Sequence, residues 1–433
     1  MKRNYNFFKA LAAFFLVNSM ALRAQLTIIT SGGLEPGGVS NNGVVSIQTV
    51  GGTAYKWDVS GGLVQIGAIT VGSGAGRSGI SYDGKKISST MTNQTTAMNE
   101  ISLYDIPSST WTNLGSLGSS SGSSTGSAWG ISGNGNVVVG LGWISAGTAH
   151  AVKWQSGSMM DLGSIVSGRS SRANGANFDG SVIVGWQDEA NGTRRGAKWV
   201  DGVESYITDN NGNLVGEASA VSADGNTIIG QAIPNPYVWN NTTGLTYITH
   251  PNAGSFFRGG ATGVSSDGNT VIGYYRNFPG PTATGEGFIW TPTGGRVNLN
   301  TYATNLGINL QGVNLSLPLA ISPDGRKIAG IGLDASNNVL TFYLDVTAYL
   351  STNESSSPNN GVSIYPNPVK DVLYIKGTGK IEKAEVYNMV GQKIRSFDTV
   401  KDQLDVSFLP KGNYILEFSV KGGKAQNLKF IKH

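Results

Sequence analysis

The sequence predicts an all-β protein, and three observations support that prediction. Glycine supplies 62 of the 433 residues, roughly twice its average share, whereas charged residues make up 13% against a typical quarter. Hydrophobic residues make up 39%, and they occur in short runs rich in Val, Ile, Trp and Tyr with little helical periodicity. A ten-residue motif with Asp-Gly at its centre recurs along the chain. Such a composition is typical of many short strands joined by tight turns.

The repeated motif is clearest at Val221–Gly230, where a short strand, a two-residue Asp-Gly turn and a second apolar strand follow one another. Asp-Gly favours two-residue hairpins because glycine accepts positive φ. The final glycine lets neighbouring backbones approach closely. A less regular copy begins at Val39. The remaining copies begin at intervals of roughly 45 residues, the spacing of propeller blades: Ile80, Ile131, Ala176, Val221, Val264 and Ile321.

A second signature follows each turn. It consists of a small or apolar residue two or three places before an aromatic residue. The aromatic residues are Trp57, Tyr104, Trp154, Trp199, Trp239, Trp290 and Tyr343. Each unit thus has four strand-sized segments, which predicts a seven-bladed β-propeller of four-stranded blades. Six or eight blades stay open, because two intervals are long. The last unit lacks its outer strand, and we expect Leu26–Thr30 to complete it and close the ring.

Over residues 25–345, these signatures resemble the extracellular HAF-type repeats, whose units carry an A-F-x-W strand followed by L-G. Phe288-Ile289-Trp290 and Leu162-Gly163 are examples of the two parts. The first unit and residues 115–128 depart from the pattern. The resemblance implies a repeat domain that acts outside the cell.

Residues 1–24 have the parts of a secretory signal peptide. A basic start precedes an apolar run at 10–17, and small residues follow at Ala21 and Ala24. The run is far shorter than the roughly 20 residues that span a bilayer, so we expect export and no transmembrane span. Cleavage after Ala21 and cleavage after Ala24 both stay open.

Charge and residue types exclude several classes of function. Residues 25–360 carry 15 basic and 20 acidic residues, so we expect no nucleic acid as a partner. The chain has no cysteine and three scattered histidines, which argues against disulfides, thiolate chemistry and a zinc site. We therefore predict no catalytic residue, no metal and no cofactor.

The long connections of the predicted blades fall at one end of the propeller, where loops on a rigid scaffold carry function. Aromatic residues end the second strands there, and they are candidates for stacking on a ligand: Trp143, Trp186, Tyr274 and Tyr275. The alternative is that they pack between neighbouring blades. Acidic residues at the same end are interpreted as solvated loop residues, with glycoside hydrolysis as the alternative: Asp188, Glu189, Glu217 and Glu286.

A polar linker at 346–360 separates the repeats from residues 361–433, which are rich in lysine and contain seven short alternating strands. This pattern predicts a small Ig-like β-sandwich. The sequence of this region resembles the type A C-terminal sorting domain of the type IX secretion system of Bacteroidetes-type bacteria. The residues that carry the resemblance are Tyr365, Pro366, Asn367, Pro368, Gly391, Gly412, Tyr414, Lys429 and Lys432.

The resemblance implies type IX secretion machinery as a partner, passage across the outer membrane, and either release or attachment to surface lipopolysaccharide after the sorting domain is removed. A generic Ig-like binding module is the alternative. We expect a secreted or surface-displayed protein, not an enzyme, whose propeller is a binding or adhesion module for a glycan or a protein. An extracellular glycan-cleaving enzyme and a structural surface protein stay open as alternatives.

Overall fold

The computed structural model describes most of the chain and has short gaps, chiefly in the C-terminal part. The described residues are 25–72, 74–281, 283–350, 363–376, 381–388, 392–398, 402–420 and 426–432. The predicted signal peptide, residues 351–360 of the predicted linker and Gly391 lie outside the described residues.

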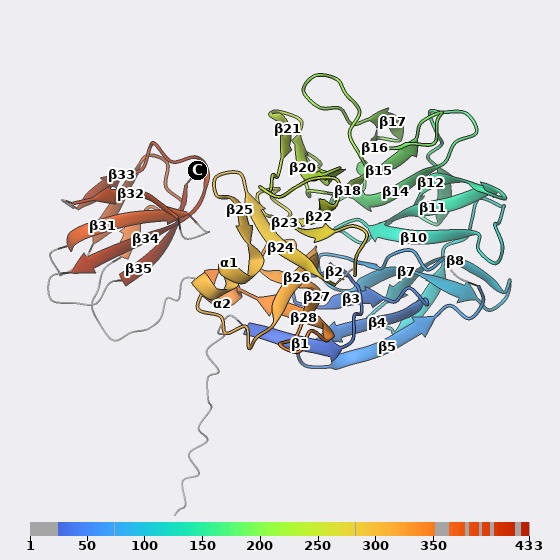
Figure 1. Ribbon diagram of the computed structural model, residues 1–433, viewed down its shortest axis with the longest axis horizontal. Coiled ribbons are helices and arrows are strands. Elements are labelled where there is room, and N and C mark those ends of the chain that lie inside the picture. Colours follow the sequence, from blue (N-terminus) through green and yellow to red (C-terminus); the bar gives the residue numbers. More distant parts are fainter. Residues whose placement is uncertain are drawn as a thin grey trace, which may run out of the picture.

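Seven antiparallel sheets of four strands form a propeller, as predicted (Figure 1). The first three blades, from the inner strand outward, are β2 (Pro36–Val39), β3 (Val45–Gln48), β4 (Thr53–Asp58) and β5 (Gly62–Ala68); β6 (Gly79–Ile80), β7 (Lys86–Asn93), β8 (Met98–Asp105) and β9 (Thr110–Asn113); and β10 (Gly126–Ile131), β11 (Val137–Ser145), β12 (Thr148–Gln155) and β13 (Ser158–Asp161).

Blades 4 to 6 repeat this order with similar strand lengths. They are β14 (Ser171–Ala176), β15 (Val182–Asp188), β16 (Arg194–Val200) and β17 (Val203–Tyr206); β18 (Ala218–Val221), β19 (Thr227–Ala232), β20 (Asn235–Asn240) and β21 (Gly244–Tyr247); and β22 (Phe257–Val264), β23 (Val271–Asn277), β24 (Gly285–Thr291) and β25 (Gly295–Asn298).

Blade 7 joins the two ends of the propeller chain. Its inner strands are β26 (Asn314–Ile321), β27 (Lys327–Leu333) and β28 (Val339–Asp345), and its outer strand is β1 (Gln25–Ser31). Leu26 of β1 lies opposite Leu344 of β28. The prediction that the N-terminal strand completes the last blade is confirmed, and the ring has no unpaired edge at this seam. Short helices α1 (Leu299–Asn305) and α2 (Thr347–Leu350) flank this blade (Figure 1).

The predicted aromatic residues of the third strands fill the space between neighbouring blades. Trp199 is fully buried, and its indole Nε1 donates to Leu162 O at 3.2 Å. At the seam between blades 1 and 7, the rings of Trp57 and Tyr343 lie 4.8 Å apart. Large aromatic side chains therefore fill the space between neighbouring blades and hold them in a circular arrangement.

The repeated turn is wider than the predicted two-residue hairpin. Five residues separate β18 from β19, and of these only Gly225 has positive φ, whereas a two-residue turn of type I′ requires two. Ser222 Oγ donates to Asp224 Oδ1 at 2.5 Å and accepts the N–H of Thr227 at 2.9 Å. The serine and the aspartate together stabilise the turn, and the role of the serine was not predicted.

The residue between the serine and the aspartate links each turn to the next blade. The backbone N–H of Asn41 donates to Tyr82 O at 3.0 Å, and that of Tyr82 donates to Gly133 O at 2.9 Å. From blade 3 to blade 4 the bond is shifted by one residue, because Asn134 N donates to Phe178 O at 2.9 Å, and blades 4 to 7 then continue the belt to Pro323. Proline has no N–H, and Asp324 N instead donates to the side chain of Asn41 at 3.1 Å. The belt of hydrogen bonds therefore closes.

The C-terminal strands form two small sheets of a β-sandwich, as predicted (Figure 1). One contains β29 (Ser363–Tyr365), β30 (Val372–Lys376) and β33 (Gln403–Asp405); the other contains β31 (Ile381–Asn388), β32 (Lys393–Phe397), β34 (Gly412–Val420) and β35 (Gln426–Lys432). Leu373, Val386 and Phe430 belong to its apolar core. Among the residues that the structure describes, none of the helices has the length and apolar character that crossing a membrane requires.

Candidate functional site at the loop face and central channel

The two ends of the propeller differ in their connections. The turn face carries the five- and six-residue Ser-x-Asp-Gly turns and their relatives. The loop face carries the connections from second to third strands, of which 278–284 is the longest, and those from blade to blade, of which 299–313 is the longest. The predicted assignment of the long connections to one end therefore agrees with the strand order.

Bulges in the inner strands determine which side chains line the channel. In six of the seven blades, the register of the first two strands shifts by one residue at the same place. Such a bulge turns the extra residue away from the regular alternation. The extra residues are Gly37, Trp129, Asn174, Ser219, Thr262 and Leu319. All of these except Asn174 line the central channel.

The glycine that ends the repeated motif makes room for the bulge. Gly185 lies opposite Ala173, and a Cβ at Gly185 would come within 1.9 Å of Arg172 O. The equivalent Gly230 and Gly330 would place a Cβ at 2.3 Å and 2.2 Å from the corresponding carbonyl oxygens. The predicted close approach of backbones is therefore real. This glycine also marks the bulge two residues before the motif, which was not predicted.

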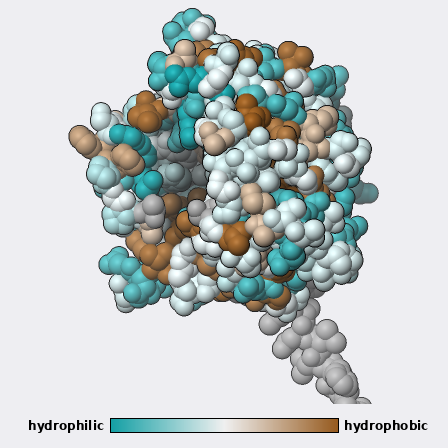
Figure 2. All heavy atoms as spheres, turned by 90° about the vertical axis from the view of Figure 1, so that its right-hand side faces the viewer, coloured by the Kyte–Doolittle hydropathy of each residue, from teal (hydrophilic) through white to brown (hydrophobic). Residues whose placement is uncertain are grey.

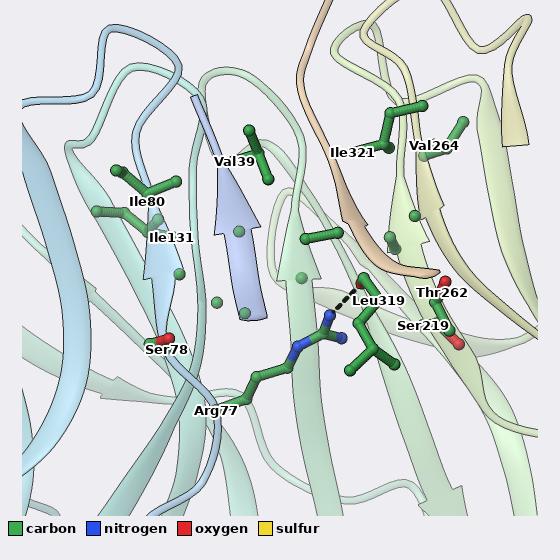
Figure 3. A pocket seen from close by; sticks show the side chains of 18 of the residues that line it. Val39, Arg77, Ser78, Ile80, Ile131, Ser219, Thr262, Val264, Leu319 and Ile321 are labelled. Carbon is green, nitrogen blue, oxygen red and sulfur yellow. Dashed lines mark hydrogen bonds between the residues drawn. The ribbon is translucent and has the colours of Figure 1, made fainter. Parts of the chain in front are cut away.

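The channel has an apolar end and a polar end. Residues at the start of the repeated motif line it towards the turn face: Val39, Ile80, Ile131, Ala176, Val221, Val264 and Ile321. Towards the loop face, Arg77, Ser219 and Thr262 line it (Figure 3). The space inside the channel that water-sized molecules can occupy is about 140 Å³.

Arg77 crosses the channel. It lies before β6 in blade 2, and its Nη2 donates to Leu319 O of blade 7 at 2.6 Å (Figure 3). Burial lowers the pKa of the guanidinium, and the charge of Glu35 and the hydroxyl of Tyr274 act in the opposite direction. The channel thus contains a partly exposed cation.

A stack of aromatic and arginine side chains lies beside the channel mouth. The guanidinium of Arg172 lies 3.4 Å from the ring centre of Trp129 and 5.2 Å from that of Trp186, and Arg194 lies 4.1 Å from Trp186. Arg172 also pairs with Glu217 at 2.7 Å. Burial lowers the pKa of Arg172 to about 10, although Glu217 opposes this. These groups hold blades 3, 4 and 5 together at the loop face.

The four aromatic residues predicted to stack on a ligand differ in exposure. Tyr275 is fully buried, and its hydroxyl donates to Ile248 O at 2.5 Å. Trp186 is 2% exposed beneath the two arginines. These two rings offer no free face, which agrees with the alternative of packing between blades. Trp143 and Tyr274 are partly exposed, so ligand stacking stays a prediction for them.

The acidic residues of the loop face are paired with arginines rather than freely solvated. Glu189 lies 2.7 Å from Arg195, and Glu286 lies 2.6 Å from Arg296. Asp188 lies 3.7 Å from Arg194, and burial raises its pKa. In the described part of the chain, no three His, Cys, Asp or Glu side chains come together as a metal site.

An exposed apolar patch lies on the loop face, and we call Ile233, Phe256 and Phe278 the loop-face patch. Their exposed fractions are 66%, 73% and 46%. Phe278 N donates to Phe256 O at 2.7 Å, and the guanidinium of Arg258 lies 4.4 Å from the Phe278 ring. On the side of the propeller shown in Figure 2, hydrophobic residues lie instead in several separate areas among polar ones. The patch was not predicted, because loop residues lack a periodic signal.

The residues of the predicted sorting motif have mainly structural contacts. Asn367 Nδ2 donates to Lys429 O at 3.1 Å, and Asn367 Oδ1 accepts the N–H of Ile431 at 2.8 Å. Pro366 and Pro368 flank this asparagine in the sequence. The ring centre of Tyr365 lies 5.6 Å from that of Tyr374.

The other described motif residues lie on the last two strands. Tyr414 is buried, and its hydroxyl donates to Pro410 O at 2.9 Å. Gly412 lies opposite Lys432, which is buried, and burial lowers the pKa of Lys429. The motif therefore joins the two sheets of the sandwich.

Comparison with known families identifies the C-terminal module. Residues 363–433 match the family described as the secretion system C-terminal sorting domain. A curated relative, beta-agarase D of Zobellia galactanivorans, is 36% identical over 74 residues, which are 17% of this chain and 15% of that protein.

Solved structures resemble the propeller at low identity. The β-propeller domain of the Trilobed protease from Pyrococcus furiosus is 14% identical, with a TM-score of 0.44 over 79% of this chain and all of that chain. An oligogalacturonate lyase in complex with manganese is 10% identical, with a TM-score of 0.45 over 75% of this chain and 93% of that one. TolB from Acinetobacter baumannii is 15% identical, with a TM-score of 0.40 over 58% of this chain and 62% of that one. These likenesses concern the fold alone.

Proposed function

We propose that this protein, which its sorting domain directs to the cell surface or the extracellular space, binds a glycan on the loop face of its propeller. The loop-face patch supports the proposal. Two phenylalanine rings and an isoleucine are 46% to 73% exposed on loops of a rigid scaffold. Flat apolar rings of this kind stack on the C–H faces of sugars.

The position of the patch also supports a bound chain rather than a single small molecule. Phe256 directly precedes β22, and Thr262 of the same strand lines the channel. Six residues of strand span roughly 20 Å. A glycan that lies on the patch can therefore extend to the channel mouth.

Binding without cleavage is favoured by the pairing of the loop-face acids. Glu189, Glu217 and Glu286 each lie within 2.7 Å of an arginine. These three carboxylates are thus occupied by arginines, and Asp188, whose pKa burial raises, is the loop-face acid that would suit a general acid. The partial match with an agarase makes cleavage the second candidate function, and agarose is therefore included among the test polymers. The resemblance to HAF-type repeats stays a prediction.

An oligosaccharide array with residues 25–433 tests the proposal. We expect at least one glycan to bind, and the double variant Phe256→Ala/Phe278→Ala to lower its affinity about tenfold through the loss of two stacking rings. Products released from the bound glycan would favour the enzyme. Absence of any glycan ligand, or full affinity in the double variant, would refute the proposal.

The sorting domain implies interaction with the type IX secretion machinery. We further propose that the domain is removed at the surface and that the propeller is attached to lipopolysaccharide. Deletion of residues 361–433 is expected to trap the propeller in the periplasm. Surface display of the truncated chain, measured with antibody on intact cells, would contradict this role.

A further inference from the structure

Arg77 is placed in the channel by contacts at both ends of the residue. Its backbone N–H donates to Ala128 O of blade 3 at 2.8 Å, and its side chain reaches Leu319 of blade 7 (Figure 3). The neighbouring Gly37 permits this path, because a Cβ there would come within 2.0 Å of Ser78 O. Three blades thus hold the guanidinium within the channel.

The guanidinium of Arg77 lacks a charged partner. Among the residues that the structure describes, no carboxylate lies within 4.0 Å of it, and it donates to Leu319 O at 2.6 Å. A guanidinium has five N–H donors, so donors remain for a further partner. A confined cation without an anion is costly, and an entering anion removes that cost.

The surrounding wall suits an acidic sugar. Trp129 lines the channel with the guanidinium of Arg172 3.4 Å from its ring centre, and Ser219 and Thr262 add hydroxyl groups. Thr262 Oγ1 donates to Pro318 O at 2.7 Å, which leaves its lone pairs to accept from a ligand. The opposite end of the channel is apolar, and the polar groups therefore favour entry from the loop face.

We infer that Arg77 binds an oxyanion, either the carboxylate of a uronic acid or a sulfate half-ester, on a sugar that enters the channel from the loop face. The inference rests on the proposed function, since the sugar belongs to the glycan held by the loop-face patch. A planar guanidinium binds planar or tetrahedral oxyanions through two N–H donors.

Two matched pairs of probes test the inference by calorimetry with residues 25–433. One pair is oligogalacturonate and its methyl ester, and the other is a sulfated galactan oligosaccharide and its desulfated form. We expect the acidic member of one pair to bind about tenfold to a hundredfold more tightly than its neutral counterpart. The pair that shows this difference distinguishes carboxylate from sulfate.

Two substitutions test whether Arg77 causes the difference in affinity between acidic and neutral probes. Arg77→Gln is expected to reduce the affinity for the acidic probe to that for the neutral one. Arg169→Gln is the matched control, because Arg169 also donates to a backbone carbonyl, that of Ala190, on the loop face outside the channel. We expect this control to bind as the wild type does. Should Arg77→Gln fail to fold, Ser219→Glu places a carboxylate in the channel, keeps Arg77, and is expected to abolish the preference for the acidic probe.

The outcomes separate the two proposals. Equal affinity for acidic and neutral probes, or an acid preference that survives both channel variants, overturns the role of Arg77 and leaves glycan binding standing. Absence of binding to all probes and to the whole array overturns the proposed function itself.

Discussion

The turn face and the loop face belong to the same blades, yet their residues are used differently. On the turn face, the repeated serine and aspartate, or the asparagines that replace one of them in blades 1, 3 and 4, form hydrogen bonds within each turn, and a belt of backbone bonds joins the blades. On the loop face, connections vary in length, apolar rings are exposed, and a cation without a charged partner among the described residues lies in the channel mouth. Repetition here marks the scaffold, and variation marks the candidate site.

The largest expected effect concerns the bulge that separates the two halves of the channel. Gly185→Val places side-chain atoms where Arg172 O lies 1.9 Å from a Cβ, so we expect a loss of about 3 kcal/mol or more in the free energy of unfolding. Gly175→Ala in the same blade is the control, because its nearest atoms are 3.6 Å away. Urea denaturation measures both. Equal stability of the two variants would show that the glycine does not serve the bulge.

The next effect is on the turn face alone. Ser222→Ala leaves the N–H of Thr227 without its acceptor in a buried turn, and we expect a loss of about 1 to 3 kcal/mol with unchanged glycan affinity. Ser205→Ala, at an exposed position of the outer strand β17, is expected to change little. A fall in affinity without a fall in stability would place function on the turn face.

A smaller effect is expected where the belt closes. Asn41→Ala removes the acceptor of Asp324 N, and we expect a loss of roughly 1 kcal/mol. Hydrogen exchange of the Asp324 amide should become faster, while exchange in the turns of blades 4 and 5 stays the same. Unchanged exchange at Asp324 would mean that the belt does not depend on this bond.

The smallest effect is a difference in pH dependence. Hydrogen bonds from the side chain and backbone of Ser181 lower the pKa of Asp179 on the turn face, so its stabilisation is lost as the pH falls through that lowered pKa. Burial raises the pKa of Glu204 to about 7, although Ile165 N donates to it at 3.1 Å. Because the folded state holds this proton more tightly, stability is expected to fall as the pH rises from about 4.5 through about 7.

Glu204→Gln tests this direction. We expect the variant to melt at a higher temperature than the wild type at pH 8 and at a similar temperature at pH 4. Asp201→Asn, at an exposed aspartate, is expected to change neither value. A wild type that is more stable than Glu204→Gln at pH 8 would contradict the assigned burial.

Local periodicity explains how much of the fold was predictable. The blade number, the closing strand at Leu26 and the sandwich follow from strand-length patterns and turn residues, which act over a few positions. The predicted two-residue length of the turn was wrong. The longer turn depends on a hydrogen bond from Thr227 N to Ser222 Oγ, which the spacing of residues does not reveal.

The candidate site was less predictable, because it depends on contacts between distant segments. Arg77 reaches Leu319, which is 242 residues away. Trp186 was proposed as a ligand contact, yet it is buried beneath arginines from neighbouring strands. The glycine at the end of each motif could have predicted the bulge. The bulge in turn would have predicted that Trp129 and Thr262 line the channel.

Two phenylalanines allow the most direct measurement of the difference between the faces. Phe178 on the turn face and Phe278 on the loop face are both 46% exposed. We predict that Phe278→Ala weakens binding of the glycan selected on the array severalfold, and that Phe178→Ala binds it as the wild type does. Weakened binding in Phe178→Ala with normal binding in Phe278→Ala would contradict the assignment of function to the loop face.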